Sequence, residues 1–230
     1  MKTKFSWIFY CLVSLLLSQS LSAAERFVTN ESNGFVWIQQ GKAYPILVDS
    51  REDKGVVWAV ANLQTDAGKV TGITPEIIHS VAGNRMLIIG SIENSSWIKQ
   101  LLKAGKINAA DLQGKREKYI LQMVKQPMEG VDEAVVIAGS DKRGTIYGIY
   151  ELSQQMGVSP WYFWADVPVE KHDIISIKEG IYTDGEPAVK YRGIFLNDEW
   201  PCLGNWAGDT FGGFNSKFYE TVFELVLRLK

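Results

Sequence analysis

Histidine and cysteine are scarce in this sequence, with two of each among 230 residues. The histidines, His79 and His172, are far apart and have no metal-ligand spacing, so the sequence predicts no metal site. A catalytic thiol needs a nearby base, and a thiol enzyme is therefore disfavoured as well. Cys11 lies in an apolar run near the N-terminus; once that run is removed, only Cys202 remains and no intramolecular disulfide can form.

Runs of basic residues are also missing. The chain has 24 Lys and Arg against 26 Asp and Glu, a net charge of −2. Without Lys2 and Lys4, which belong to the N-terminal segment described next, 22 basic residues remain and the net charge is −4. Nucleic-acid-binding proteins need surfaces that neutralise phosphates, so a nucleic-acid partner is not expected. Hydrophobic residues make up 46% of the chain, which is enough for a globular core.

The N-terminal segment has the pattern of a secretory signal peptide. Two lysines precede an apolar run over residues 5–17, and small residues follow at Ser22-Ala23-Ala24. The run is shorter than the roughly 20 apolar residues that a spanning helix needs. The alternative, an interfacial anchor, lacks a charged face. We therefore expect residues 1–24 to be removed, the mature chain to begin near Glu25, and the protein to be periplasmic or secreted in a bacterium.

Strands and helices alternate irregularly over residues 25–187, which is typical of a mixed α/β domain. β-branched and aromatic runs predict the strands, and apolar periodicity with capping residues predicts the helices. The predicted strands cover residues 35–38, 46–48, 86–89, 119–124, 134–138 and 173–177; the predicted helices cover residues 53–66, 97–102 and 143–156. Gly68 is expected just past the end of the first helix.

A glycine-rich loop over residues 139–145 lies between a predicted strand and a predicted helix, as phosphate-binding loops do. A true P-loop continues with Lys and then Ser or Thr, whereas this one continues with Thr145-Ile146. We interpret the loop instead as a helix start capped by Ser140 or Asp141. The buried stripe of that helix is expected to contain Ile146, Ile149, Tyr150 and Ser153.

Four aromatic residues follow in a row at Trp161-Tyr162-Phe163-Trp164. One regular helix or strand face cannot bury them all. Either they wedge two domains together, which we favour for Trp161, or some line a sugar-binding cleft, which is equally plausible for Trp164.

The pattern changes after a polar link at residues 179–187. Residues 189–196 form an apolar run that predicts a strand, residues 197–214 predict a loop with four glycines, and residues 215–230 predict a helix. Strand, loop and helix make one βα unit. A single βα unit cannot bury its strand, so we interpret residues 188–230 as the start of a parallel sheet or barrel that is incomplete in these 230 residues.

Several ordered segments carry a resemblance. They are residues 139–148 (GSDKRGTIYG), 160–168 (PWYFWADVP) and 191–199 (YRGIFLNDE), with 211–215 (FGGFN) and 223–230 (FELVLRLK). Together they resemble glycoside hydrolase family 115, whose members remove (4-O-methyl-)glucuronic acid side chains from xylan. The match spans about Val135 to Lys230, while residues 25–134 agree only in general organisation. The resemblance implies an N-terminal α/β domain and, over residues 188–230, the first βα unit of a truncated catalytic (β/α)₈ TIM barrel. It also implies an inverting mechanism, and neither metal nor organic cofactor.

The resemblance also implies candidate site residues. Asp198 matches the acidic position at the end of the first barrel strand, and Glu199 follows it, so both are candidate catalytic residues. Inversion needs an acid and a base about 6.5–9.5 Å apart, so these neighbours are not expected to form the pair by themselves. Asn197, Trp164 and Arg143 are candidate substrate-binding residues, Arg143 for a uronate carboxylate. Alternatively, Asn197 and Asp198 only shape a turn, and Arg143 is only a solvated charge.

Two other functions are open from the sequence: a related barrel glycosidase such as a hexosaminidase, and a non-catalytic carbohydrate-binding module. The Asn-Asp-Glu-Trp sequence argues against the first, and the unpaired βα unit against the second. The expected partner is xylan or a glucuronoxylan oligosaccharide, with a homodimer open for the full-length enzyme and no membrane contact after signal cleavage. The 230 residues alone are expected to be inactive.

Overall fold

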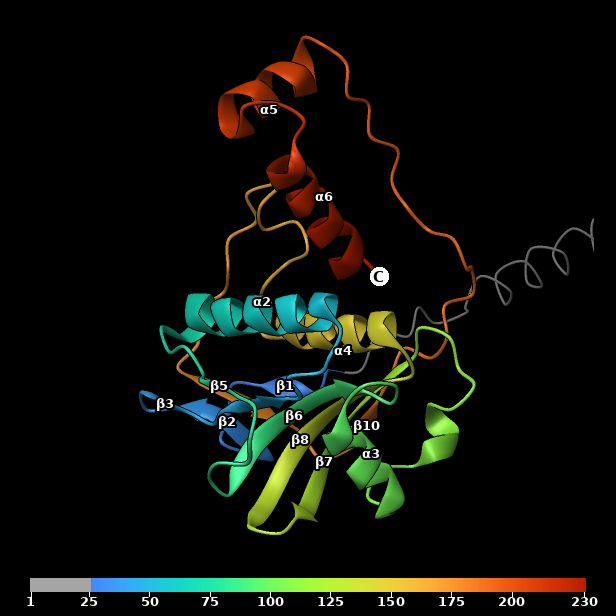
Figure 1. Ribbon diagram of the computed structural model, residues 1–230. Helices are drawn as coiled ribbons and strands as arrows, with labels where there is room; N and C mark the ends of the chain where they lie inside the picture. The colour runs from blue at the N-terminus through green and yellow to red at the C-terminus, as the bar shows by residue number, and fades with distance from the viewer. Residues whose placement is uncertain (1–25) are drawn as a thin grey trace, which may run out of the picture.

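The structure, a computed structural model, describes residues 26–230, and it has the mixed α/β architecture that the sequence predicts (Figure 1). The predicted signal peptide and Cys11 lie outside the described residues. Every predicted strand before residue 180 is present, although β7 (Tyr119–Met128) and β8 (Val131–Gly139) are longer than expected. A single turn of 3-10 helix, Ala109–Asp111, precedes β7.

A six-stranded sheet in the order β10-β7-β8-β6-β4-β5 forms the centre of the molecule. Strand β6 (Arg85–Ser91) pairs in parallel with β4 (Ile46–Val48) and with β8, and β4 pairs in parallel with β5 (Ile77–Ile78). Strand β7 is antiparallel to β8, and β10 (Ile181–Tyr182) is antiparallel to β7. Strand β6 is buried along almost its whole length, which explains why its sequence is a continuous apolar run.

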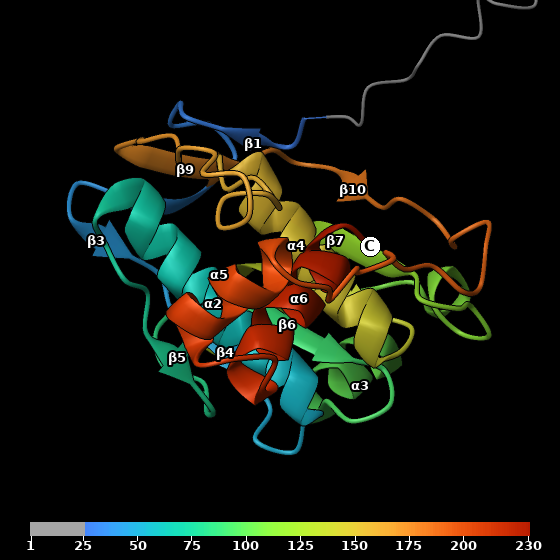
Figure 2. The ribbon, with the colours of Figure 1, turned by 90° about the horizontal axis from the view of Figure 1, so that it is seen from above.

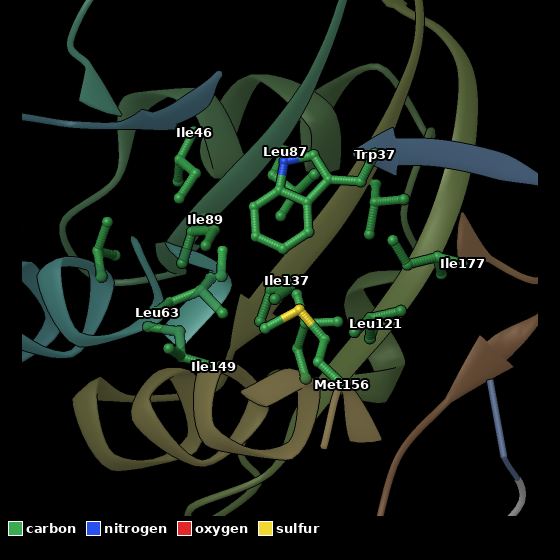
Figure 3. Close-up of a cluster of buried hydrophobic side chains, with 14 of the residues drawn as sticks. Trp37, Ile46, Leu63, Leu87, Ile89, Leu121, Ile137, Ile149, Met156 and Ile177 are labelled. Carbon is green, nitrogen blue, oxygen red and sulfur yellow. The ribbon is translucent and has the colours of Figure 1, made fainter. Parts of the chain in front are cut away.

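The two faces of this sheet have separate cores. Leu87 and Ile89 of β6 face α2 (Lys54–Thr71) and α4 (Lys142–Gln155), which lie side by side (Figures 1, 2 and 3). Met86 and Ile88 face the opposite side, where α3 (Ser96–Lys103) packs. The alternation follows from the two-residue period of a strand.

A small antiparallel sheet in the order β1-β9-β2-β3 lies beside the first. Strand β9 (Ile174–Ile177) pairs with both β1 (Val28–Thr29) and β2 (Phe35–Gln39), and β2 pairs with β3 (Lys42–Ala43). The chain after α4 thus returns to the start of the domain, and the side chain of Trp37 is buried between the two sheets' core residues (Figure 3).

The glycine loop before α4 has a packing role. Asp141 caps the helix, its Oδ1 accepting from the backbone N–H of Gly144 at 2.8 Å, which confirms the predicted cap. A Cβ on Gly139 would meet the backbone nitrogen of Thr145 at 2.2 Å, and a Cβ on Gly144 would meet the Lys118 carbonyl oxygen at 2.3 Å. These close approaches explain why both positions are glycine, without a phosphate-binding role for the loop.

One helix boundary was predicted wrongly. Helix α2 continues through Gly68 and ends at Gly72, which has a left-handed conformation with φ of 74°. Gly68 instead lies against the Thr74 side chain, where a Cβ would be 3.0 Å from Oγ1. The apolar stripe continues with Val70, so burial rather than the first glycine decides where the helix stops.

The second part of the chain differs from the predicted βα unit. Residues 189–196 form no strand, and Phe195 and Tyr191 are 93% and 82% exposed. The strand prediction is wrong for this structure because no other strand of residues 26–230 lies alongside to provide hydrogen bonds. The segment instead runs outside the domain toward α5 (Figure 1).

Helix α5 (Cys202–Phe211) replaces most of the predicted loop, so that prediction is also wrong. Gly204 allows close packing, since a Cβ there would lie 2.7 Å from the Trp200 ring. Helix α6 (Ser216–Arg228) confirms the predicted final helix, with Asn215 as its cap. Helix α6 lies against the α2–α4 layer on the side away from the sheet, and α5 lies beyond α6 (Figure 1).

Candidate active site

The candidate catalytic residues lie on the exposed segment that leads into α5. Asp198 and Glu199 are exposed, as is Asn197. Trp200 anchors the segment, because its ring lies over Gly204, and the Glu199 carbonyl oxygen accepts from the Gly204 N–H at 3.3 Å. Within residues 26–230, the Asp198 side chain forms no hydrogen bond or ion pair, so its carboxylate is free to bind an external hydroxyl or proton.

Trp164 lies in an aromatic cluster between the loop after α4, α5 and α6. Its Nε1 donates to the Thr221 carbonyl oxygen at 3.3 Å, and its ring centroid lies 5.4 Å from that of Trp206 and 6.1 Å from that of Phe218. The ring is half-buried, and it also lines a surface hollow with Phe163, Leu203 and Trp206. Trp164 therefore packs within the aromatic cluster and also lines the hollow.

The wedge expected of Trp161 is not formed, since this residue is 42% exposed. Tyr162, the next residue, makes the contact between the first domain and α6 instead. Its hydroxyl donates to Glu224 of α6 at 3.0 Å, and burial raises the pKa of this hydroxyl to about 12, so it stays protonated at neutral pH.

Arg143 belongs to a charged cluster at the start of α4. Its Nη2 lies 3.1 Å from Oε1 of the buried Glu117, and Arg192 Nη2 lies 2.6 Å from the other oxygen of the same carboxylate. The hydrogen bond with Glu117 raises the pKa of Arg192, which also donates to the Tyr147 hydroxyl at 3.0 Å. Arg143 keeps 52% of its side chain exposed, so it can still meet an anion.

The structure places the predicted site residues in three places: the segment before α5, the aromatic cluster and the start of α4. Asn197, Asp198 and Glu199 lie before α5, and Trp164 contacts the same helix through Trp206. Arg143 instead lines a separate hollow between α4, the segment at residues 190–194 and the end of α6. No hydrogen bond, ion pair or ring contact in the described part of the chain joins Arg143 to the other four.

One charged cluster was not foreseen from the sequence. Arg228 of α6 is buried against Asp66 of α2, with Nη2 and Oδ2 2.8 Å apart, and its Nε donates to Glu224 Oε1 at 2.8 Å. The Asp66 oxygens accept no well-aligned hydrogen bond, so that contact is chiefly ionic. The available signals were the i, i+4 spacing of Glu224 and Arg228 and the position of Asp66 on the apolar stripe of α2.

The chemistry available here is that of carboxylates and aromatic rings. An exposed carboxylate can hydrogen-bond sugar hydroxyls or transfer a proton, and a flat ring can pack on the apolar face of a pyranose. Over residues 26–230 no group of three His, Cys, Asp or Glu side chains could hold a metal ion. In the same part of the chain, every helix is too short or too polar to cross a membrane.

Comparison with known proteins agrees with this chemistry. Residues 32–152 match the model of the glycosyl hydrolase family 67 N-terminus, and residues 184–230 match the model of glycosyl hydrolase family 115. A solved family 115 4-O-methyl-α-glucuronidase, with specificity for decorated arabinogalactans, is 34% identical over 85% of this chain, with a TM-score of 0.71. The chain spans 25% of the length of that enzyme.

A mutant Streptomyces plicatus β-hexosaminidase is matched over 66% of this chain and 23% of its own, at 13% identity and a TM-score of 0.37. A likeness at that level says nothing further about this chain. Among curated proteins, none matches significantly.

The α/β domain and the segment after it are thus both those of a glycosyl hydrolase. The chain belongs to glycosyl hydrolase family 115, with a first domain of the family 67 N-terminal type. This confirms the family expected from the sequence, and it extends the match well beyond the part after Val135 that the motifs indicated.

Proposed function

We propose that this chain is part of an α-glucuronidase that releases (4-O-methyl-)glucuronic acid side chains from a plant polysaccharide. The observation that carries the proposal is the match at 34% identity and a TM-score of 0.71 to a 4-O-methyl-α-glucuronidase. Glucuronoxylan is the substrate that the sequence motifs favour. The specificity of the matched enzyme makes a decorated arabinogalactan the second candidate backbone.

The proposed mechanism is inverting hydrolysis in a (β/α)₈ barrel whose first unit includes residues 188–230. Asp198 then takes part in proton transfer or binds sugar hydroxyls, and its partner in catalysis comes from another barrel strand. Trp164 packs against a sugar ring, and Arg143 pairs with a uronate carboxylate. Two observations support this mechanism. Asp198 is exposed and has no partner among residues 26–230, and residues 189–196 have the apolar character that suits a strand buried in a barrel.

Activity of the full-length natural protein tests this function. Purified enzyme is expected to release glucuronic acid from glucuronoxylan or from glucuronic-acid-decorated arabinogalactan, measured by chromatography of the product. The 230 residues alone are expected to release none, because a complete barrel takes about 250 residues. Absence of glucuronic acid release from both polysaccharides by the full-length protein would refute the proposal.

Export is proposed as well, supported by the basic, apolar and small-residue pattern of residues 1–24. N-terminal sequencing of protein recovered from the periplasm or medium is expected to begin near Glu25. Recovered protein that still carries Lys2 would contradict cleavage.

A further inference from the structure

A second hollow lies on the side of the first domain away from α5 and α6, where β2 and β3 form a hairpin (Figure 1). It measures about 520 Å³, within the range of roughly 300–1,000 Å³ typical of small-molecule sites. Its lining combines the half-buried ring of Tyr44 with four polar side chains: Gln39, Gln40, Lys42 and Arg85. Trp37 also belongs to the wall, but its own ring is buried in the core. The hollow shares none of these residues with the candidate active site.

The walls of this hollow are held in place by specific contacts. The Trp37 indole N–H donates to the Tyr44 carbonyl oxygen at 2.9 Å, and the Tyr44 N–H donates to the Trp37 carbonyl oxygen at 3.0 Å. The Arg85 guanidinium lies 4.9 Å from the ring centroids of both Phe35 and Tyr44, and 2.6 Å separates its Nη2 from Glu133. A preformed site loses little conformational freedom on binding, which favours affinity.

The rim of the hollow has free hydrogen-bonding groups. Lys42 and Gln40 are exposed at the hairpin turn, and neither side chain has a hydrogen bond or ion pair within residues 26–230. Gln39 donates its amide N–H to Ser32 at 2.8 Å, which leaves its amide oxygen available. Since Arg85 already has Glu133, Lys42 is the cation whose charge an incoming anion would balance.

We infer that this hollow is a second saccharide-binding site, which takes an oligosaccharide carrying a uronic acid. Lys42 binds the carboxylate, the amides of Gln39 and Gln40 bind hydroxyl groups, and the half-buried Tyr44 ring packs against the sugar. The choice of a uronic acid as ligand rests on the proposed function. The shape and lining of the hollow are independent of that function. Such a site would hold the polysaccharide on the enzyme while side chains are removed elsewhere.

Hydrogen exchange with mass spectrometry locates the binding. The full-length Asp198→Asn protein, which is expected to consume the probe at least tenfold more slowly than the parent, is titrated with a xylooligosaccharide that carries one 4-O-methylglucuronic acid. Exchange of amides in residues 36–44 is expected to slow, and the titration gives a Kd. Lys42→Met should raise that Kd about tenfold, because a charge-assisted hydrogen bond is lost. Lys103→Met is the matched control and should leave the Kd unchanged, because Lys103 of α3 is exposed and has no partner in the described part of the chain.

The outcomes separate this inference from the proposed function. Unchanged exchange at residues 36–44, or an equal Kd in the Lys42 and Lys103 variants, overturns the second site even if the parent enzyme releases glucuronic acid. Slowed exchange that depends on Lys42 supports the site even if no release is found. An undecorated xylooligosaccharide that protects the hairpin equally well overturns the role of the carboxylate.

Discussion

Asp198→Asn in the full-length enzyme is expected to lower kcat/KM for glucuronic acid release by about 10²–10⁴-fold if Asp198 transfers a proton. If Asp198 only binds sugar hydroxyls, the expected loss is about tenfold to a hundredfold, since one charged hydrogen bond contributes about 1.5–3 kcal/mol. Asparagine is nearly isosteric, and Asp198 is exposed without a partner in the described part of the chain. The melting temperature should therefore not change.

A matched control is available on the helix that follows. Asp209→Asn alters another exposed carboxylate, on α5, and should leave both kcat/KM and melting unchanged. Measurements use glucuronoxylan oligosaccharides, with thermal melting of each variant in parallel. An Asp198→Asn enzyme that melts like its parent and keeps full activity would show that Asp198 only shapes the turn.

Local sequence pattern predicted the first domain well because its strands and helices carry their own signals. Strand β6 is buried on both faces and reads as a continuous apolar run, and α4 begins at a capping Asp141. The short strands β1, β3, β5 and β10 have only two residues each, too few to show a period. Except for β3, which forms a hairpin with β2, they depend on partners that are distant in the chain, such as Ile177 beside Val28.

The second part was predicted less well for a related reason. Residues 189–196 have strand-forming composition, but a strand needs a hydrogen-bonded neighbour, and composition cannot provide one. Helix α5 was missed because its glycines suggested a loop, whereas Gly204 allows the Trp200 ring to pack closely on the helix. Tertiary contact overrides helix propensity here.

The candidate site was only partly predictable for the same physical reason. Motifs indicated Asp198 and Glu199 as candidates, which stay predictions, but motifs could not show that Arg143 shares the carboxylate of Glu117 with Arg192. These three residues come from separate parts of the sequence. Pairing of charges across such separations follows from the fold, and no spacing in the sequence encodes it.

Arg228→Met is expected to destabilise the protein by about 3–5 kcal/mol, because it removes the cation from a buried ion pair. Arg228 is 3% exposed and Asp66 is 1% exposed. The guanidinium also contacts Glu224 and lies 4.5 Å from the ring centroid of Tyr150 and 5.0 Å from that of Tyr162. Without it, two carboxylates of α2 and α6 are left without their shared cation. Lys69, with Nζ 3.7 Å from Asp66 Oδ1, gives only partial compensation.

Companion variants identify the cause of the expected loss of stability in Arg228→Met. Arg228→Lys should fall between parent and Arg228→Met, since an ammonium cannot reproduce the planar contacts of a guanidinium. Adding Asp66→Asn to Arg228→Met should recover part of the loss, because the uncompensated charge is gone. Lys125→Met, at a lysine whose side chain is 72% exposed and whose partner Glu179 is 71% exposed, is the surface control and should cost about 1 kcal/mol or less.

Urea unfolding of the full-length protein, followed by tryptophan fluorescence, gives these differences as shifts of the transition that reports on α6 and the aromatic cluster. The Arg228 contacts hold α6 against α2, and α6 contacts Trp164 through Phe218. Loss of Arg228 should therefore also loosen the aromatic cluster and raise KM more than it lowers kcat. If Arg228→Met unfolds at the same urea concentration as Lys125→Met, the buried pair does not hold the helix, and the helix is fixed by its apolar contacts alone.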